Sequence, residues 1–298
     1  MKELISQIND LKKQKNAVLL VHNYQRPEIY EVADFIGDSL ELSRKAAETD
    51  ADIIVFCGVK FMAETAKILN PGKTVLLPTL EAGCSLADMA TVQEVEKMRA
   101  LFPKAAVVSY VNTNADVKAV SDICCTSANA VKVVNTLEED EIIFLPDKNL
   151  GRYVQSKSGK NIHLWEGNCS VHQDLTAADL IEFKKAHPDA KIIAHPECRQ
   201  EILEVADHVC GTGGMAKYAQ QTDAGDFIVV TECGMTNKLR EDVPGKNFYS
   251  FCNICRYMKA TTLELVLQSL KEEKYKIELP ETIIHKANKA IVKMLEVA

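Results

Sequence analysis

The amino-acid sequence predicts an α/β fold of three quasi-equivalent α/β/α units, with short parallel sheets around a pseudo-threefold axis and a shared site at the centre. Two observations lead to this prediction. Similar segments recur three times, in register, along the 298 residues. Each segment alternates helix-like stretches with short runs rich in Val, Ile and Leu, a pattern typical of parallel strands that are buried on both faces and joined by right-handed crossovers.

The repeat is visible in polar positions as well as in apolar ones. Three sets of residues each recur at steps of 88 and then 85 residues. These sets are His22, Tyr110 and His195; Asp34, Asp122 and Asp207; and Ser39, Ser127 and Thr212. Because chance rarely aligns several residue types at one spacing, the coincidence indicates an internal repeat.

Four strands are expected in each unit. The first strands are the apolar runs that end near His22, Tyr110 and His195, and the second strands begin at Asp34, Asp122 and Asp207. The third strands are DIIVF, EIIFL and DFIVV, which begin at Asp52, Glu141 and Asp226. The fourth are KTVLLP, KNIHLW and KNFYSF, which begin at Lys73, Lys160 and Lys246. Shortly after each fourth strand stands a cysteine: Cys84, Cys169 and Cys255.

Helices are expected between the strands. Pro27 is typical of a first helical position, and Ser39, Ser127, Thr212 and Asn149 are expected to begin helices as N-terminal caps. The first 15 residues and the tail after residue 260, which Pro280 interrupts, also have helical patterns. Neither segment resembles an independent domain, so we expect the tail to pack on the first unit. The predicted domains are 1–85 with 261–298, 86–170 and 171–260.

Composition excludes several classes of protein. A net charge of -7 without a basic cluster argues against nucleic acid as a partner. The chain has no apolar run of the roughly 18 residues that a membrane span requires, so no membrane partner is expected. The first residues lack the apolar core of a secretory signal, and 10 cysteines without such a signal indicate a reducing compartment. We therefore expect a cytoplasmic protein.

Four of the cysteines are expected to be small hydrophobic residues of the core. This interpretation is favoured for those in or beside apolar runs, which are Cys57, Cys198, Cys210 and Cys233. Cys124 and Cys125 are adjacent in a strand and point to opposite sides, so one site cannot easily use both. Cys252 and Cys255 form a CxxC motif, a moderate signal for metal or redox chemistry.

The polar residues of the repeat are expected to converge. Ligands of parallel α/β sheets bind beyond the carboxyl ends of the strands, where His22, Tyr110 and His195 lie. If Ser39, Ser127 and Thr212 cap helices that point to the same place, their N–H groups would favour an anionic ligand, although they could also be ordinary caps. Cys84, Cys169 and Cys255 could hold an iron–sulfur cluster or zinc with one open position, or share only a common descent.

A wider set of motifs resembles one family. The set comprises HNYQ from His22, GDS from Gly37, YVNT from Tyr110, CCTSANA from Cys124, LPDKNLG from Leu145, GNCSVH from Gly167, HPEC from His195 and CNICRYMKATTLE from Cys252. Together these motifs, spread over nearly the whole chain, resemble quinolinate synthase of NAD biosynthesis. The resemblance implies three α/β/α units around a central active site, which agrees with the repeat.

The resemblance also implies an activity. Members of that family condense iminoaspartate with dihydroxyacetone phosphate to form quinolinate, with release of phosphate and water. They use one 4Fe-4S cluster per chain, in which one iron stays open as a Lewis acid, and they depend on an enzyme that supplies iminoaspartate from aspartate. The matching cluster ligands are Cys84, Cys169 and Cys255.

Further residues match the family's substrate contacts and catalytic groups. The substrate contacts are His22, Ser39, Tyr110, Val111, Asn112, Ser127, His195, Pro196, Glu197 and Thr212, and the acid–base candidates are Tyr24, Glu197, His195 and Tyr110. We expect Tyr24 and Glu197 to face each other as an acid–base pair, with burial raising the pKa of Glu197. We expect His172 to lie behind Cys169 without touching substrate.

Some features depart from the family, and two other functions remain open. Gly213 and Gly214 stand where many relatives have hydroxyl residues, Ser170 replaces a common proline, and the CxxC is shorter than the cysteine run of some members. A regulatory disulfide within this CxxC is therefore doubtful. The alternatives are another iron–sulfur hydro-lyase and a non-catalytic sensor of a small anion, which should carry an output surface that is not evident here.

Overall fold

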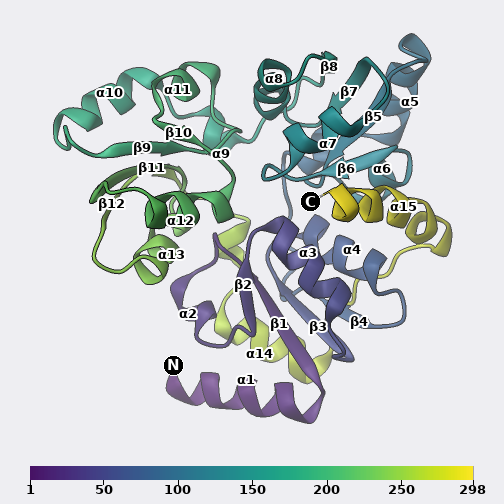
Figure 1. Cartoon of the computed structure of the whole chain (residues 1–298). Helices are drawn as coiled ribbons and strands as arrows, with labels where there is room; N and C mark the ends of the chain where they lie inside the picture. Colours follow the sequence, from purple (N-terminus) through teal and green to yellow (C-terminus); the bar gives the residue numbers. More distant parts are fainter. Residues whose placement is uncertain (298) are drawn as a thin grey trace.

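Three four-stranded parallel sheets, each flanked by helices, make up the computed structural model, which describes residues 1–297 (Figure 1). The strand orders are β2-β1-β3-β4, β6-β5-β7-β8 and β10-β9-β11-β12, so every sheet has the same topology. All pairs within these sheets are parallel. The predicted fold class and the four strands per unit are confirmed.

Each sheet takes its strands from one predicted unit. The first contains β1 (Ala17–His22), β2 (Phe35–Gly37), β3 (Ile53–Cys57) and β4 (Thr74–Leu76), with helices α1 (Lys2–Gln14), α2 (Pro27–Tyr30), α3 (Ser39–Glu48) and α4 (Lys60–Leu69). The second contains β5 (Ala106–Tyr110), β6 (Ile123–Cys125), β7 (Glu141–Leu145) and β8 (Asn161–Leu164), with η1 (Ala87–Met89), α5 (Val92–Leu101), α6 (Ala115–Ala119), α7 (Ala130–Thr136) and α8 (Lys148–Lys157).

The third sheet contains β9 (Lys191–Ala194), β10 (His208–Val209), β11 (Asp226–Glu232) and β12 (Asn247–Asn253). Its helical segments are α9 (Ser170–Gln173), α10 (Ala177–Lys185), α11 (Gln200–Val205), α12 (Thr212–Gln221), α13 (Gly234–Asp242) and η2 (Met258–Ala260). The tail forms α14 (Leu263–Glu272) and α15 (Glu281–Val297). The exact boundaries between domains remain a prediction.

The repeated aspartates have one structural role in all three units. The Asp34 carboxylate accepts the N–H of Leu19 at 2.8 Å, while the Asp34 N–H donates to the Leu19 carbonyl at 3.0 Å. Asp122 makes the same two contacts with Val107 at 2.8 and 3.0 Å, and Asp207 with Ile192 at 2.9 and 2.9 Å. Each aspartate thus ties the start of the second strand to the first strand.

The repeated lysines hydrogen-bond to the C-terminal end of a helix in each unit. The ammonium groups of Lys73, Lys160 and Lys246 donate to the carbonyls of Thr49, Leu137 and Thr222, the latter two at 2.9 and 2.5 Å. These three carbonyls belong to the residues that end α3, α7 and α12. A cation at a helix C-terminus satisfies a free carbonyl and favours the helix dipole, so the lysines explain part of the repeat.

The predicted helix caps are wrong by one or two residues. Asp38 caps α3 by accepting the N–H groups of Leu40 and Glu41, so Ser39 is the first helical residue. Gly211 and Asn129 precede α12 and α7, which places Thr212 inside its helix and Ser127 in the turn before α7. Asp147, not Asn149, caps α8. The carboxylates of Asp38 and Asp147 compete well for the first N–H groups of α3 and α8, whereas α7 and α12 begin without a side-chain cap.

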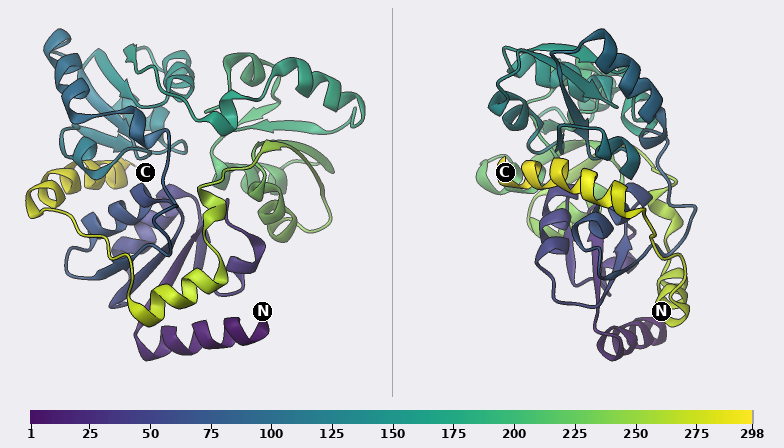
Figure 2. Two further views of the ribbon diagram at one scale, coloured as in Figure 1. Left: turned by 180° about the vertical axis from the view of Figure 1, so that it is seen from behind. Right: turned by 90° about the vertical axis from the view of Figure 1, so that its right-hand side faces the viewer.

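The tail divides between two units. Leu263, Val266 and Leu270 of α14 pack with α1 and the first sheet, as expected. Helix α15 instead lies between the first and second units, against α4, α6 and β6 (Figures 1 and 2). Buried Ala287, Ile291 and Met294 on α15 therefore join a hydrophobic core that extends through all three units.

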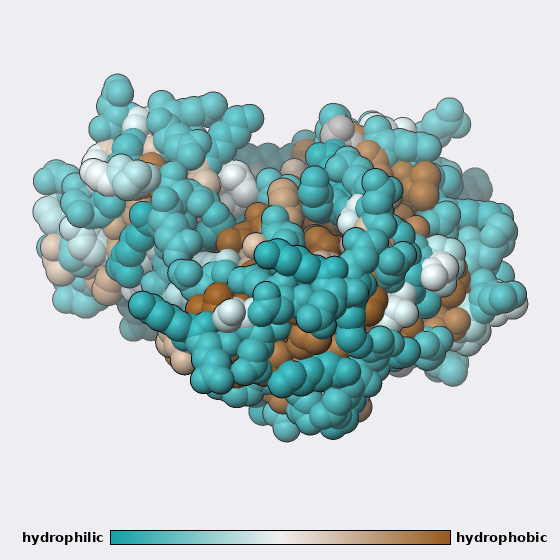
Figure 3. Space-filling model, turned by 90° about the horizontal axis from the view of Figure 1, so that it is seen from below, coloured by the Kyte–Doolittle hydropathy of each residue, from teal (hydrophilic) through white to brown (hydrophobic). Residues whose placement is uncertain are grey.

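The face that α1 and α14 cover is mainly hydrophilic, with apolar patches between the polar side chains (Figure 3). Among the described residues, no helix is both long and apolar enough to span a bilayer.

The aspartate contact leads to a prediction about stability. Asp122→Ala leaves the buried N–H of Val107 without its side-chain acceptor, which costs about 1–3 kcal/mol. The midpoint of urea unfolding should fall accordingly. Asp140→Ala is the control, because the Asp140 side chain is 99% exposed and contacts only a lysine. Equal losses in both variants would contradict the role assigned to the repeated aspartate.

Candidate active site

One cavity lies where the carboxyl ends of the three sheets meet. Its lining residues come from all three units and include twelve of the predicted site residues. These are His22, Tyr24, Ser39, Cys84, Tyr110, Asn112, Ser127, Cys169, His195, Glu197, Thr212 and Cys255. Val111 and Pro196 are buried beside the cavity and do not line it with their side chains, so their predicted contacts with substrate remain predictions.

The first strand of each unit delivers buried side chains to the cavity. His22 ends β1 and Tyr24 follows it, Tyr110 ends β5, and His195 and Glu197 follow β9, all buried to at least nine-tenths. The imidazole Nδ1 of His22 accepts the N–H of Tyr24 at 3.1 Å, and that of His195 faces the N–H of Glu197 at 3.4 Å. The equivalent turns therefore orient equivalent rings.

The N-terminal ends of α3 and α12 and the turn before α7 approach one another closely. Ser127 Oγ lies 3.1 Å from His195 Nε2, and the amide of Asn23 donates to Thr212 Oγ1 at 3.2 Å. A Cβ at Gly213 would lie 2.8 Å from a carboxylate oxygen of Asp38, and one at Gly211 would lie 3.0 Å from Ser127 Oγ. Gly211 and Gly213, the latter one of the glycines that depart from the family pattern, thus permit this close contact.

The three repeated cysteines each precede a short helical turn. Cys84 precedes η1, Cys169 is the residue before α9, and Cys255 precedes η2. Burial raises the pKa of the Cys84 thiol to about 12, while N–H groups of Ala87 and Leu86 at the sulfur oppose this. Burial also raises the pKa of Cys169 and Cys255. Because nearby thiolates repel one another, the site favours a bound positive charge.

Two buried carboxylates that sequence analysis missed hold two of these cysteine segments. Asp147 accepts the N–H of Cys169 at 3.1 Å, and Glu232 accepts the N–H of Cys255 at 3.0 Å. Asp147 and Glu232 each stand six residues after the start of the third repeat strand, at Glu141 and Asp226. The first unit has Gly58 at this position. The repeat register could therefore have identified them.

Thr231 and His172 connect the predicted acid–base pair. The phenol of Tyr24 lies 2.6 Å from Thr231 Oγ1, which lies 2.9 Å from His172 Nε2. Nδ1 of His172 lies 3.2 Å from a carboxylate oxygen of Glu197. His172 lies near Cys169, as expected, and it also lines the cavity, so its expected lack of contact with substrate stays a prediction. Nothing in the sequence pointed to Thr231, an apparently ordinary β-strand residue.

Burial determines the charge of most groups in the cavity. It lowers the pKa of His22 to about 3, assisted by Lys259, and lowers the pKa of His172 to about 3. It raises the pKa of Tyr24 and Tyr110 well above its usual value, so both phenols keep their protons. Burial disfavours the Glu197 carboxylate, but contacts with His172 and His195 outweigh it and lower the Glu197 pKa. The expected rise is therefore wrong.

Comparisons with known proteins point to one family. The sequence model of the quinolinate synthetase A protein family matches residues 6–296. A quinolinate synthase of Thermodesulfovibrio yellowstonii is 51% identical over 294 residues, which cover 98% of this chain and 97% of that protein. Quinolinate synthase 1 of Methanosarcina acetivorans is 49% identical over 297 residues, which cover 99% and 98%.

The chain belongs to the quinolinate synthetase A family. The resemblance found in the sequence is therefore confirmed at the level of the family.

Two sets of residues in this family member could hold a metal. One atom each of Cys169, His172 and Glu197 lie within 4.8 Å of one another, close enough for a single ion. Cys84, Cys169 and Cys255 instead approach from three units around the same cavity. Thiolates select zinc or iron–sulfur clusters. The three-thiol set, with N–H groups at the sulfurs of Cys84 and Cys255, fits a cluster with one open iron.

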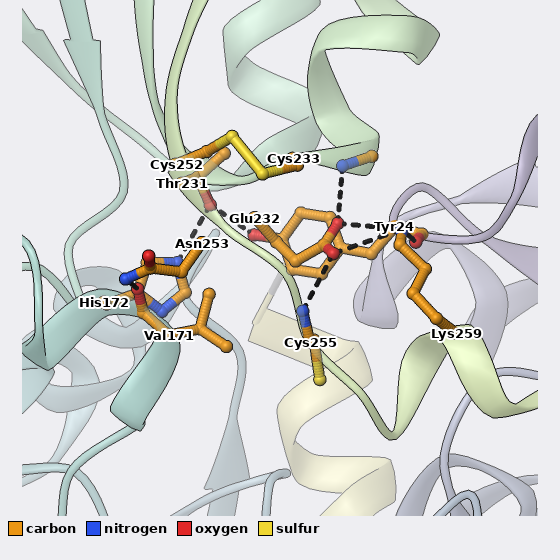
Figure 4. The surroundings of a disulfide bond; sticks show 11 residues. Tyr24, Val171, His172, Thr231, Glu232, Cys233, Cys252, Asn253, Cys255 and Lys259 are labelled. Atoms are coloured by element: carbon orange, nitrogen blue, oxygen red, sulfur yellow. Dashed lines mark hydrogen bonds and ion pairs between the residues drawn. A yellow bond between two sulfur atoms is a disulfide. The ribbon is translucent and has the colours of Figure 1, made fainter.

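The remaining cysteines do not line the cavity. Cys57, Cys124, Cys125 and Cys198 are buried, and Cys210 is partly exposed. Cys233 forms a disulfide with Cys252, which corrects the prediction of Cys233 as a hydrophobic core residue (Figure 4). This leaves the CxxC of the family member with one free thiol, that of Cys255.

The buried histidines lead to a prediction about acid sensitivity. His22 stays neutral in the folded chain between about pH 3 and its ordinary pKa of 6.5, whereas it takes up a proton when the chain unfolds. The unfolded state thus binds more protons, and stability falls on acidification by about 1.4 kcal/mol per pH unit for each such group.

Urea unfolding of the cluster-free chain between roughly pH 6.5 and 4.5 measures how steeply the free energy of unfolding depends on pH. His22→Gln should reduce it, whereas the exposed His285→Gln should not. An unchanged slope in His22→Gln would show that His22 is protonated in the folded chain.

Proposed function

We propose that the chain is a quinolinate synthase of NAD biosynthesis, a transferase that condenses iminoaspartate with dihydroxyacetone phosphate to quinolinate and releases phosphate and water. The observation that carries this proposal is the convergence of three cysteines, one from each unit, with buried acid–base groups on one cavity. The names of the relatives support it, since they are quinolinate synthases over almost the full length of the chain.

Cys84, Cys169 and Cys255 would hold one 4Fe-4S cluster. When bound, such a cluster offers an open iron that acts as a Lewis acid toward a substrate oxygen. The chain itself prepares the ligands, because Asp147 and Glu232 accept the N–H groups of Cys169 and Cys255. These contacts fix the backbone of two ligands before any metal arrives.

The ends of α3 and α12 and the turn of Ser127 would bind the anionic groups of the substrates. Ser39, Ser127 and Thr212 line the cavity, and capping by Asp38 leaves the Ser39 hydroxyl available for a ligand. Helix N-termini favour carboxylates and phosphate. Asn112 Oδ1 is buried without a partner, which supports its role as a further polar contact to substrate.

Tyr24 and Glu197 would carry the proton transfers. Glu197 is ionised and one of its oxygens, Oε1, is buried without a hydrogen-bond partner, so it can accept a proton from a carbon next to a carbonyl. Tyr24 keeps its proton and can donate it to an oxygen. Because the Glu197 carboxylate faces Nδ1 of His172, it favours a proton there and leaves Nε2 to accept from Thr231.

The Thr231 hydroxyl then accepts a hydrogen bond from the phenol of Tyr24, so the hydrogen bonds from Tyr24 to Glu197 all run in one direction. His195 and Tyr110 are the next acid–base candidates, since both line the cavity. A cytoplasmic setting and an enzyme that supplies iminoaspartate from aspartate belong to the same proposal. Neither nucleic acid nor a membrane is part of it.

The cluster is tested by single cysteine variants. Cys84→Ala, Cys169→Ala or Cys255→Ala should abolish cluster assembly, measured as iron and sulfide after anaerobic reconstitution and as loss of the brown colour. Cys57→Ala, Cys124→Ala, Cys198→Ala and Cys252→Ala are the controls and should keep it. Loss of iron from Cys252→Ala would move the third ligand, and zinc in place of iron and sulfide would refute the cluster.

The acid–base pair is tested by variants that keep shape. Tyr24→Phe and Glu197→Gln should bind substrate and keep the cluster, yet lose turnover by roughly a hundredfold or more, the scale of general acid–base catalysis. Thr231→Val should lower turnover with little change in KM, and Thr231→Ser should restore it because it keeps the hydroxyl. Near-normal turnover in both Tyr24→Phe and Glu197→Gln would shift the role to His195 and Tyr110.

A further inference from the structure

A disulfide joins the ends of two neighbouring strands beside the cavity. Cys233 follows β11 and Cys252 lies near the end of β12, with their Cα atoms 5.1 Å apart. The N–H of Cys233 also donates to the carbonyl of Asn253 at 3.2 Å. Figure 4 shows the bond lying next to Thr231 and Glu232, the last two residues of β11.

The two strands do not depend on this bond. Their register runs without interruption from Asp226↔Asn247 to Glu232↔Asn253. Phe227 and Phe248, both buried, stack across the pair with ring centroids 5.4 Å apart. Because these contacts hold the strands together, reduction would leave the two thiols adjacent and ready to pair again. Both cysteines are partly exposed, so a small disulfide or thiol can reach them.

Cys252 has a second partner within reach along the chain. Cys255 follows it after Asn253 and the exposed Ile254, in the spacing of redox-active CxxC pairs. In the structure the two sulfurs lie on opposite sides of the strand end, with the Cys255 sulfur directed away from the disulfide (Figure 4). Glu232 holds the N–H of Cys255 at 3.0 Å in this arrangement.

We propose that Cys233 protects Cys255 from oxidation by capturing Cys252 in the disulfide between β11 and β12. Whenever the cluster is absent, a disulfide reagent would otherwise be able to join Cys252 to Cys255. That bond would consume the only free thiol of the CxxC. Cys233 has the advantage, since the register that pairs Thr231 with Cys252 brings the Cα atom of Cys233 to 5.1 Å from that of Cys252, whereas Cys255 must turn away from Glu232.

The exchange is balanced in atoms and electrons. A low-molecular-weight disulfide is attacked by the Cys252 thiolate, which forms a mixed disulfide and releases one thiol. The Cys233 thiolate then attacks the Cys252 sulfur, forms the protein disulfide and releases the second thiol. The protein loses two electrons and two protons, and the small disulfide gains both. Without Cys233, the Cys255 thiolate takes the second step.

Disulfide mapping tests this inference. The cluster-free full chain is reduced, incubated with oxidised glutathione, alkylated and digested with trypsin, which separates peptide 218–238 with Cys233 from peptide 247–256 with Cys252 and Cys255. The wild type should show these two peptides linked and Cys255 alkylated. Cys233→Ser should instead show a bond inside peptide 247–256 and loss of Cys255 alkylation.

Matched variants complete the test. The double variant Cys233→Ser/Cys252→Ser should recover Cys255 alkylation, and Cys210→Ser, which removes another partly exposed thiol, should behave as wild type. Cys233→Ala is a second variant in case Cys233→Ser does not fold, which circular dichroism checks. A bond between Cys252 and Cys255 in the wild type would overturn the inference, as would unchanged Cys255 alkylation in folded Cys233→Ser or Cys233→Ala.

The importance of this protection rests on the proposed role of Cys255 as a cluster ligand. The disulfide mapping does not depend on that role. After glutathione treatment, iron uptake should fall in Cys233→Ser and not in the wild type. If untreated wild type takes up no iron, the proposed cluster fails while the peptide map still decides the disulfide exchange. If iron uptake is normal and the map shows no protection, only the present inference fails.

Discussion

The candidate site depends on two buried carboxylates that accept backbone N–H groups where β7 and β11 end. Irregular backbone that leaves a sheet inside a protein must find hydrogen-bond partners, because no bulk water is present to supply them. Asp147 and Glu232 meet this need for the segments of Cys169 and Cys255. Burial raises the pKa of both carboxyls, so their charge is costly to keep. Lys259, 3.1 Å from Glu232, offsets part of that cost and connects it to the carbonyl of Tyr24.

The three units differ at the strand ends that line the cavity. Gly58 occupies the position of the two carboxylates in the first unit, and the Cys84 sulfur there receives N–H groups from Leu86 and Ala87. The first and third units supply His22, Tyr24, His195 and Glu197, whereas the second supplies a phenol at the equivalent strand end. Three copies of one architecture thus provide a symmetrical frame for the proposed reaction, whose substrates would not be symmetrical. Divergence at a few strand ends would be sufficient to separate the proposed acid, base and anion sites.

The features that were predicted correctly from the sequence are those that recur. The three sheets with four strands each and the convergence of their strand ends on one cavity follow from residues in register, since equivalent strands must end at equivalent places. The helix caps were misplaced because Asp38 and Asp147 stand next to other polar residues that could serve equally well. Thr231 was missed because its importance arises from a contact with Tyr24 of the first unit, and the contacts of His172 with Thr231 and Glu197 were not foreseen because periodicity does not encode them. The site of α15 escaped prediction for the same reason, as its apolar face suits more than one unit.

The fold limits which cysteines can bind a metal, whereas composition alone does not. Ten thiols could in principle compete for one metal site. Four are buried, two form the disulfide between β11 and β12, and Cys210 lies outside the cavity beside Gly214. Only Cys84, Cys169 and Cys255 combine a free thiol with a place in the cavity wall. The choice of metal-site cysteines therefore depends on the burial, pairing and position of the other seven cysteines as much as on the three in the cavity wall. A disulfide at the edge of the site belongs to this arrangement because it removes the thiol nearest along the chain to Cys255.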